Sequence, residues 1–148
     1  MEAVILCGLQ ATGKSTLCRE RFFRTHVRIN LDMLKSRHRE AILVRACLEA
    51  KQPFVVDNTN PTREDRKKYV ETARAAGFKV VCYYFESRVA ESLIRNESRP
   101  DDEQVPSPGI KATAARLELP SRAEGFDEMY YVRIGTGSME VQEWRDEV

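Results

Sequence analysis

The chain has 148 residues, 42% of them hydrophobic, and a formal net charge of +1 at pH 7. This length and composition suit one domain with one buried core. The four cysteines show neither C-x-x-C spacing nor a His-rich neighbourhood, which argues against a zinc site or a disulfide framework and predicts a reduced, cytoplasmic compartment. No apolar stretch approaches the ~20 residues of a membrane span, so we expect no membrane partner.

The first predicted strand, residues 3–7, leads into Gly8 to Thr16, which fits the phosphate-binding pattern G-x-x-x-x-G-K-[ST]. A helix is predicted from Ser15 to Phe23, so the motif has the strand, loop and helix context that it requires. Its glycines allow backbone N–H groups to surround a phosphate, Lys14 reaches the β- and γ-phosphates, and the Ser15 hydroxyl binds Mg2+. The predicted cofactors are therefore ATP and Mg2+. The residues expected to contact the nucleotide are Gly8, Gln10, Ala11, Thr12, Gly13, Lys14, Ser15 and Thr16.

A short second strand is predicted at residues 27–30, followed by one helix from Met33 to Ala50. Asp32 lies between them, where a kinase needs a carboxylate to orient an attacking hydroxyl and accept its proton. The alternative is that Asp32 only caps the helix. Lys35 and Arg39 are four residues apart and share a face of this helix. They are candidates for binding a phosphate of the acceptor, and the alternative is that they are solvent-exposed charges.

The third predicted strand, residues 54–56, ends directly before Asp57. This is the position at which a phosphate-loop protein places the acidic residue of its Mg2+ shell, so Asp57 is a candidate metal ligand with Ser15. Asp57 could equally face the acceptor, and the alternative is that it only forms an Asx turn or a helix cap. The next helix is expected to begin at Asn60, as N-cap, and to end at Gly77.

A fourth strand at residues 80–85 and a helix from about residue 89 to 96 follow. This alternation predicts an α/β protein with the P-loop NTPase fold, in which a parallel sheet of about four to five strands carries helices on both faces. Ligands then bind at the carboxyl ends of the strands. Further along, a hairpin turn at residues 135–138 is expected to join strands at 130–134 and 139–143.

The segment from about residue 95 to 116 is a candidate helical lid. Its middle, Asp101 to Gly109, is rich in acidic residues and proline, which suggests a mobile cover. Arg95 and Arg99 are four residues apart at the base of this cover and can project together onto a triphosphate to stabilise charge that develops during transfer. Helix-end arginines are also common as ordinary surface charges.

Charge is distributed unevenly along the chain. Residues 19–39 hold seven basic side chains against two acidic ones, whereas the segment from Glu118 onward holds eight acidic against three basic. The basic segment predicts a face beside the phosphate loop that attracts polyanions. The alternative is that these charges only solvate helix faces.

Separate blocks, taken in order, resemble the 5′-hydroxyl polynucleotide kinase family, which includes the kinase domain of animal polynucleotide kinase-phosphatase and the phage end-healing enzyme. The blocks that carry the resemblance are the phosphate loop Gly8 to Thr16, Ile29-Asn30-Leu31-Asp32, Asp57-Asn58-Thr59-Asn60-Pro61, Tyr69 to Gly77, Arg95 to Arg99 and Ala123-Glu124-Gly125-Phe126. Together they span roughly residues 3 to 134.

The resemblance implies a single kinase domain over residues 1–148 that transfers the γ-phosphoryl group of ATP to a 5′-hydroxyl end of DNA or RNA. Asp32 would be the general base, Lys14 and Ser15 would hold the triphosphate and Mg2+, and Arg95 and Arg99 would be lid arginines. The acceptor region would contain Asp32, Lys35, Arg39, Asp57 and Asn58. A chain of this length has no room for a phosphatase or ligase domain, so such a partner would be a separate protein.

Two other hypotheses remain open at the level of the sequence. One is a kinase for a small hydroxylated metabolite such as a nucleoside, a sugar nucleotide or an antibiotic, because many stand-alone phosphate-loop kinases share this pattern. The other is a nucleotide-gated binding module with slow hydrolysis.

Overall fold

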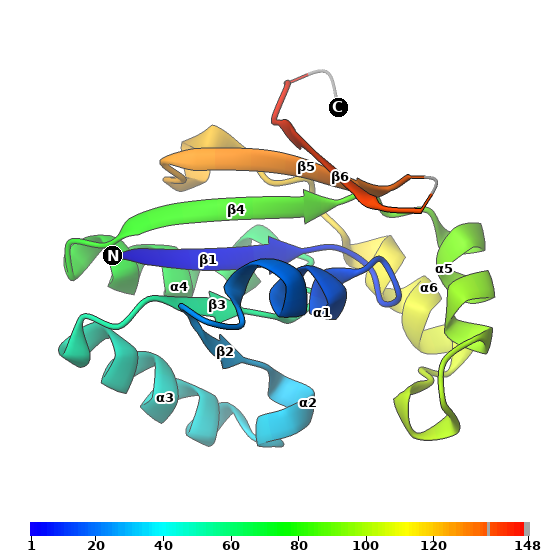
Figure 1. Ribbon diagram of the computed structural model, residues 1–148, viewed down its shortest axis with the longest axis horizontal. Helices are drawn as coiled ribbons and strands as arrows, with labels where there is room; N and C mark the ends of the chain where they lie inside the picture. The colour runs from blue at the N-terminus through cyan, green and yellow to red at the C-terminus, as the bar shows by residue number, and fades with distance from the viewer. Residues whose placement is uncertain (136, 147–148) are drawn as a thin grey trace.

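The computed structural model describes residues 1–135 and 137–146, which form one six-stranded sheet in the order β2-β3-β1-β4-β5-β6 (Figure 1). The strands are β1 (Glu2–Cys7), β2 (Val27–Ile29), β3 (Phe54–Val56), β4 (Lys79–Phe85), β5 (Glu128–Ile134) and β6 (Met139–Glu143). The first five are parallel, and β6 pairs antiparallel with β5. The predicted parallel α/β sheet is confirmed, with an antiparallel sixth strand added by the predicted hairpin. In the turn of that hairpin Gly135 N donates to Ser138 O at 2.7 Å, and Thr136 lies outside the described residues.

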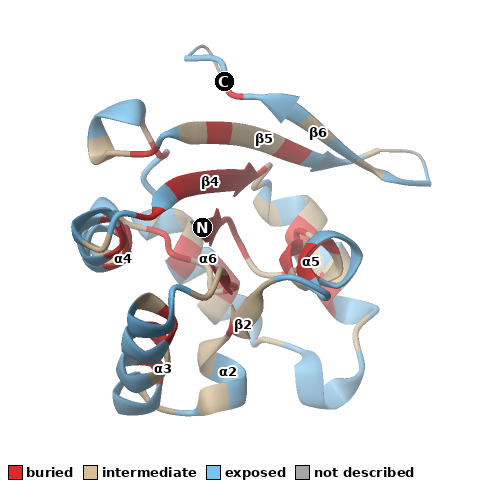
Figure 2. Ribbon diagram, turned by 60° about the vertical axis from the view of Figure 1, so that its left-hand side comes forward, coloured by how far each residue is buried: buried red, intermediate tan, exposed pale blue. Residues whose placement is uncertain are grey.

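The core lies on both faces of the central strand β1. Residues 3–7 are wholly buried, and because successive side chains of a strand point to opposite faces, they divide between two apolar clusters. One cluster lies under α3 (Arg37–Ala50) and α4 (Arg63–Ala75), and the other lies under α1 (Lys14–Leu17) and the π-helical turn η1 (Cys18–Phe22). Figure 2 shows the resulting burial along β4 and on the inward sides of α3 and α4.

The prediction of one helix from Met33 to Ala50 is wrong. The structure has a short helix, α2 (Leu31–Leu34), which is separated from α3 by Lys35 and Ser36. Lys35 has a left-handed backbone with φ of 71°, and the Ser36 side chain accepts a hydrogen bond from the Arg39 N–H as the N-cap of α3. A serine hydroxyl at this position gives the backbone an alternative to continued helix, which is why the chain turns here.

Helix α4 also begins later than predicted. Its N-cap is Thr62, which forms a capping box with Asp65. Asn60 is not the cap: it has a φ of 45°, and its side-chain amide donates to Leu6 O at 2.7 Å. Asn60 thereby ties the turn after β3 to the end of β1.

The lid segment contains α5 (Val89–Glu97), the short 3-10 helix η2 (Asp101–Glu103) and α6 (Ser107–Arg116). Figure 1 shows α5 and α6 together beyond the carboxyl ends of the parallel strands. A second 3-10 turn, η3 (Arg122–Glu124), follows α6 and precedes β5. Helices α5 and α6 therefore lie between β4 and β5 in the chain. Within the described ranges, no helix has both the length and the apolar character needed to cross a membrane.

Candidate active site

The phosphate loop is held by segments that follow β3 and β4, the two strands that flank β1. Gly8 N donates to Thr59 O after β3 at 3.0 Å, and Leu9 N donates to Ser87 Oγ after β4 at 3.0 Å. A Cβ on Gly8 would lie only 2.9 Å from the Cβ of Phe85, so the loop can approach β4 this closely only with glycine. These contacts hold the loop at the carboxyl end of β1.

Helix α1 begins at Lys14, directly after Gly13, whose φ of 99° favours glycine. The first N–H groups of a helix have no intrahelical partner, and they carry the positive end of the helix dipole. The described structure thus has the strand, loop and helix arrangement in which backbone N–H groups bind phosphate.

Lys14 is buried inside the loop. Its Nζ donates to Gly8 O at 2.9 Å and also to Leu9 O, so the ammonium group is held by the loop's own carbonyl groups. Burial lowers the pKa of Lys14 to about 8; Asp57 opposes this shift, and the charge of Arg99 adds to it. A buried ammonium with few anionic neighbours gains most from a ligand with several negative charges.

Ser15 and Asp57, the predicted metal pair, do meet. Ser15 Oγ donates to Asp57 Oδ2 at 3.0 Å, and the Asp57 side chain is 2% exposed. Arg28 on β2 joins them, because its Nε donates to the same Asp57 oxygen at 2.8 Å. The sequence reasoning missed Arg28. The strand register brings Arg28 to Asp57. Arg28 pairs with Val55 in β3, and Asp57 comes two residues after Val55, so its side chain points to the same face of the sheet.

This pair of oxygen ligands fits Mg2+. Magnesium usually keeps several waters and binds one or two protein oxygens together with substrate phosphates. Ser15 and Asp57 would hold the ion, which would neutralise charge on the phosphates. Over residues 1–135 and 137–146, no group of three or more His, Cys, Asp or Glu side chains is placed to hold a metal ion.

Asp32, the predicted base, is an exposed residue of α2. Figure 1 shows α2 beyond the carboxyl end of β2. It caps neither helix. Asn30 caps α2 by accepting from Met33 N at 2.9 Å, and Ser36 caps α3. The Asp32 carboxylate makes no hydrogen bond or ion pair with any other residue in the described part of the chain.

The remaining residues of the predicted acceptor region are differently placed. Lys35 precedes α3, so it does not share a helix face with Arg39, contrary to prediction. Arg39 Nη1 donates to Leu34 O at 3.0 Å. Both polar ends of the Asn58 side chain are engaged inside the protein: Oδ1 accepts from Leu31 N at 2.8 Å, and Nδ2 donates to Glu40 Oε2 at 3.0 Å.

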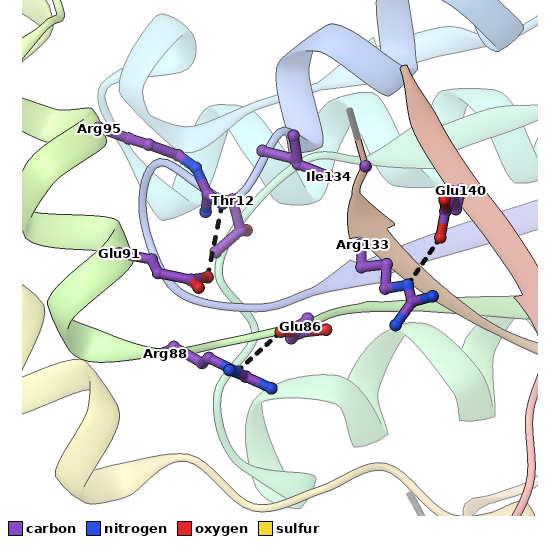
Figure 3. A pocket seen from close by; sticks show the side chains of 9 residues that line it. Thr12, Glu86, Arg88, Glu91, Arg95, Arg133, Ile134 and Glu140 are labelled. Atoms are coloured by element: carbon purple, nitrogen blue, oxygen red, sulfur yellow. Dashed lines mark hydrogen bonds and ion pairs between the residues drawn. The ribbon is translucent and has the colours of Figure 1, made fainter. Parts of the chain in front are cut away.

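Of the two predicted lid arginines, Arg95 lies in the last turn of α5, and Arg99 directly follows the C-cap of that helix, Ser98. Arg95, with Thr12, lines a charged cavity of about 350 Å³ between α5, the phosphate loop and the hairpin β5–β6 (Figure 3). Arg95 Nη2 lies 3.5 Å from Glu91 Oε2 on the same helix. Arg99 Nη1 donates to Glu103 O at 3.4 Å, and Arg99 is close enough to depress the pKa of Lys14.

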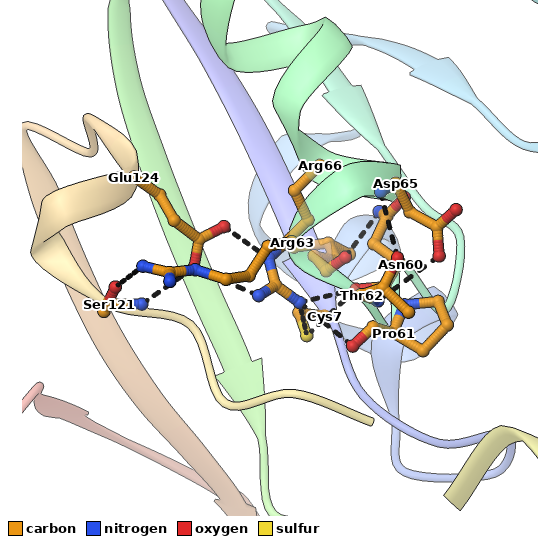
Figure 4. Close-up of polar contacts among 10 residues, drawn as sticks. Cys7, Asn60, Pro61, Thr62, Arg63, Asp65, Arg66, Ser121 and Glu124 are labelled. Carbon is orange, nitrogen blue, oxygen red and sulfur yellow. Dashed lines mark hydrogen bonds and ion pairs between the residues drawn. The ribbon is translucent and has the colours of Figure 1, made fainter. Parts of the chain in front are cut away.

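A buried ion pair supports the turn beneath the loop (Figure 4). The Arg66 side chain is 0% exposed and binds both carboxylate oxygens of Glu124, at 2.8 and 3.0 Å. Arg66 Nη1 also donates to Asn60 O at 2.9 Å and Pro61 O at 3.2 Å. The same turn supplies Thr59 O to Gly8, so this ion pair reaches the phosphate loop through the backbone. In the sequence, only the block at residues 123–126, which carries part of the family resemblance, had drawn attention to Glu124.

Comparison with known proteins places these features in a family. A family model described as an AAA domain, AAA_33, matches residues 4–120. The bifunctional polynucleotide phosphatase/kinase of Schizosaccharomyces pombe is 30% identical over 134 residues, which cover 84% of this chain. The chain spans about a third of the length of that relative, of which 32% is covered.

Solved structures show the same fold at low identity. Kti12 of Chaetomium thermophilum, in complex with ADP-AlF3, has a TM-score of 0.72, 16% identity and 88% coverage of both chains. A gluconokinase from Sinorhizobium meliloti has a TM-score of 0.65 and 17% identity, with 91% of this chain and 83% of that chain covered. With a family model that matches most of its length and a phosphate loop in the required setting, the chain belongs to the AAA_33 family of AAA domains and has the P-loop kinase fold.

Proposed function

We propose that this protein is an ATP-dependent phosphotransferase that moves a γ-phosphoryl group to a hydroxyl. The observation that carries the proposal is Asp32. It is an exposed carboxylate with no capping role. Its helix, α2, follows β2, which lies next to β3, and Asp57 directly follows β3. The phosphate loop with its buried Lys14 supplies the donor side, and an exposed carboxylate at the same sheet edge supplies a base.

The proposed reaction follows from these positions. The α1 N–H groups and Lys14 bind the β- and γ-phosphates and stabilise the negative charge of the leaving diphosphate. Asp32 accepts the proton of the acceptor hydroxyl. The hydroxyl oxygen then bonds to the γ-phosphorus, and the bond between that phosphorus and the β,γ-bridging oxygen breaks. Mg2+, when bound at Ser15 and Asp57, supplies further charge neutralisation. Arg95 and Arg99 add positive charge from the lid side.

Two acceptor classes have support. A 5′-hydroxyl end of DNA or RNA is supported by the 30% identical relative, which is named a polynucleotide phosphatase/kinase, and by the exposure of Asp32, which leaves room for a large acceptor. A small hydroxylated metabolite is supported by the breadth of kinases that share the fold. These include the gluconokinase and a sugar kinase from Janibacter sp. HTCC2649 with a TM-score of 0.67 and 15% identity.

One transfer assay separates these classes. The protein is incubated with ATP labelled at the γ-phosphate and a panel of acceptors: 5′-hydroxyl DNA, 5′-hydroxyl RNA, nucleosides, sugars, a sugar nucleotide and an aminoglycoside. We expect label on one class, loss of nearly all transfer in Asp32→Asn, and retained ATP binding in that variant. Asp101→Asn, an exposed carboxylate of the lid, is the matched control. Absence of transfer to every acceptor, with ATP still bound, would contradict the proposal.

A further inference from the structure

A buried carboxylate on α3 has no part in the chemistry proposed above. The Glu40 side chain is 3% exposed and accepts hydrogen bonds from the Tyr69 hydroxyl at 2.6 Å and Arg37 Nη1 at 2.9 Å. Burial by itself raises the pKa of Glu40, but the hydrogen bonds from Tyr69 and Arg37 outweigh it and hold the pKa below its ordinary value. Glu40 is therefore ionised at neutral pH, and a carboxylate ion can only accept hydrogen bonds.

That property determines which way the Asn58 amide faces. Glu40 Oε2 accepts from Asn58 Nδ2 at 3.0 Å, so the amide oxygen must point the other way. There it accepts from the N–H of Leu31 at 2.8 Å. Leu31 is the first residue of α2, where a backbone N–H has no partner within the helix. Glu40 thus acts on α2 through the orientation of one side-chain amide.

A second asparagine makes the complementary connection. Asn30 Nδ2 donates to Asp57 O at 2.6 Å, while Asn30 Oδ1 accepts from Met33 N at 2.9 Å. Asp32 lies between Leu31 and Met33, so the residues on both sides of it are bound to asparagines. Both asparagines connect to the turn that begins at Asp57. The backbone of Asp32 is consequently held relative to Asp57 from two directions.

We propose that Glu40 and Asn58 are positioning residues for Asp32: the Glu40 carboxylate selects the amide orientation of Asn58 that holds the first turn of α2. The inference rests on the proposed function in one respect, which is the role of Asp32 as the base. On this reading Asn58 does not contact the acceptor, because both of its polar ends are used within the protein.

The positioning role can be tested by reversing the direction of the hydrogen bond from Asn58 to Glu40. In Asn58→Asp, two carboxylates face each other at the 3.0 Å contact, and their repulsion moves residue 58 away from Leu31. In the double variant Asn58→Asp with Glu40→Gln, the glutamine amide donates to the new aspartate, which still accepts from Leu31. If the cluster only stabilised the fold, the melting temperature would respond to these changes, and kcat of the folded protein would not.

The measurements are kcat, the dissociation constant for ATP, and the melting temperature. We expect Asn58→Asp to lower kcat about 10²-fold, the scale of a small misplacement of a reacting group, with unchanged ATP affinity. The double variant should recover at least about tenfold of that loss. Tyr69→Phe is the matched control, because it removes another hydrogen bond to the same carboxylate while Arg37 still holds it. It should lower the melting temperature and leave kcat within about twofold.

Exchange of the Leu31 amide hydrogen provides a readout that needs no acceptor. In Asn58→Ala this amide should lose protection, while in Tyr69→Phe it should not. If the wild-type chain transfers phosphate to no acceptor, the proposed function fails, and the Leu31 exchange still decides whether Asn58 holds α2. The positioning role is overturned if Asn58→Ala leaves the Leu31 amide protected, or if the double variant is no more active than a folded Asn58→Asp.

Discussion

Arg28 and Ser15 donate hydrogen bonds to the same oxygen of Asp57, Arg28 Nε at 2.8 Å and Ser15 Oγ at 3.0 Å. The guanidinium group therefore occupies one side of the carboxylate that we propose as a metal ligand. Arg28 Nη2 also lies 3.4 Å from Ser15 Oγ. A divalent cation held by Asp57 would compete with Arg28 for its negative charge, since both cations would bind one buried carboxylate.

Removal of Arg28 should consequently strengthen Mg2+ binding. We expect Arg28→Met to lower the Mg2+ concentration for half-maximal ATP turnover about tenfold, because a positive charge beside a carboxylate shifts its cation affinity by a factor of ten or more. Arg24→Met is the control, since Arg24 is exposed in the same basic segment and its loss changes the net charge equally. An equal shift in both variants would mean that only the net charge of the segment matters.

Lys14 should make nucleotide affinity dependent on pH. Its pKa is about 8, lowered chiefly by burial, and only the protonated form attracts phosphate. Affinity for a fluorescent ATP analogue should therefore fall as the pH rises from 7.5 to 9.5, and binding near pH 8 should take up protons. Lys14→Arg should bind with little pH dependence over this range, because arginine stays charged. A flat profile in the wild-type protein would rule out the lowered pKa.

The same group predicts a direction for stability. Between pH 8 and its ordinary value of 10.5, Lys14 is more protonated in the unfolded chain than in the folded one. The contribution of Lys14 to the free energy of unfolding should therefore rise with pH across this window, and it should be lowest below pH 8. Denaturant titrations at several pH values can compare the wild type with Lys14→Met. The free energy of unfolding of the wild type should rise relative to that of the variant as the pH rises from 8 to 10.5. No such rise would mean that burial does not lower the pKa of Lys14.

Removal of the buried Arg66 side chain should strongly destabilise the fold. Arg66→Ala leaves the Glu124 carboxylate, 8% exposed, without its main partner, and we expect a loss of about 3–5 kcal/mol in the free energy of unfolding. Arg63→Ala is the control. Arg63 approaches the same carboxylate at 3.9 Å, but its side chain is 53% exposed, so the loss should stay below about 1 kcal/mol. Similar losses in both variants would show that burial of the pair is not decisive.

Arg99 should act on turnover more than on nucleotide binding. An arginine that neutralises charge developing on the transferred phosphoryl group contributes on the order of 10³ in rate, so Arg99→Ala should lower kcat by about that factor. Arg116→Ala, a 60% exposed arginine of the same lid on α6, should leave kcat unchanged. If Arg99→Ala instead raised only the KM for ATP, its role would be binding of the ground state.

The donor half of the site could be predicted from the sequence because it is local. The apolar run of β1, the two glycines and the Lys14-Ser15 pair are neighbours in the chain, and their geometry follows from backbone conformation over a few residues. The end of β3 before Asp57 was also predicted correctly, since its three apolar residues form a buried run. Strand β2 was predicted as well, but it ends at Ile29, one residue earlier than expected.

The break between α2 and α3 could not be predicted with the same rules. Helical spacing continues from Met33 across Lys35 and Ser36. In the structure α2 ends because Lys35 has a left-handed backbone, and α3 starts at its N-cap Ser36. Asn30 and Asn58 bind the N–H groups at the start of α2. Asn30 and Ser36 cap helices that begin next to them in the chain, but Asn58 follows β3. Its effect on Leu31 depends on how β2 and β3 pair.

What the sequence by itself determined is therefore the phosphate loop, the α/β order of elements and the positions of Asp32 and Asp57 after two strands, because each depends on residues close together in the chain. Only the tertiary structure decided that Arg28 shares Asp57 with Ser15, that Glu40 orients Asn58, and that Arg66 supports the turn beneath Gly8. Those contacts join residues that parallel pairing and helix packing bring together from distant parts of the chain. No local pattern of side chains encodes such a register.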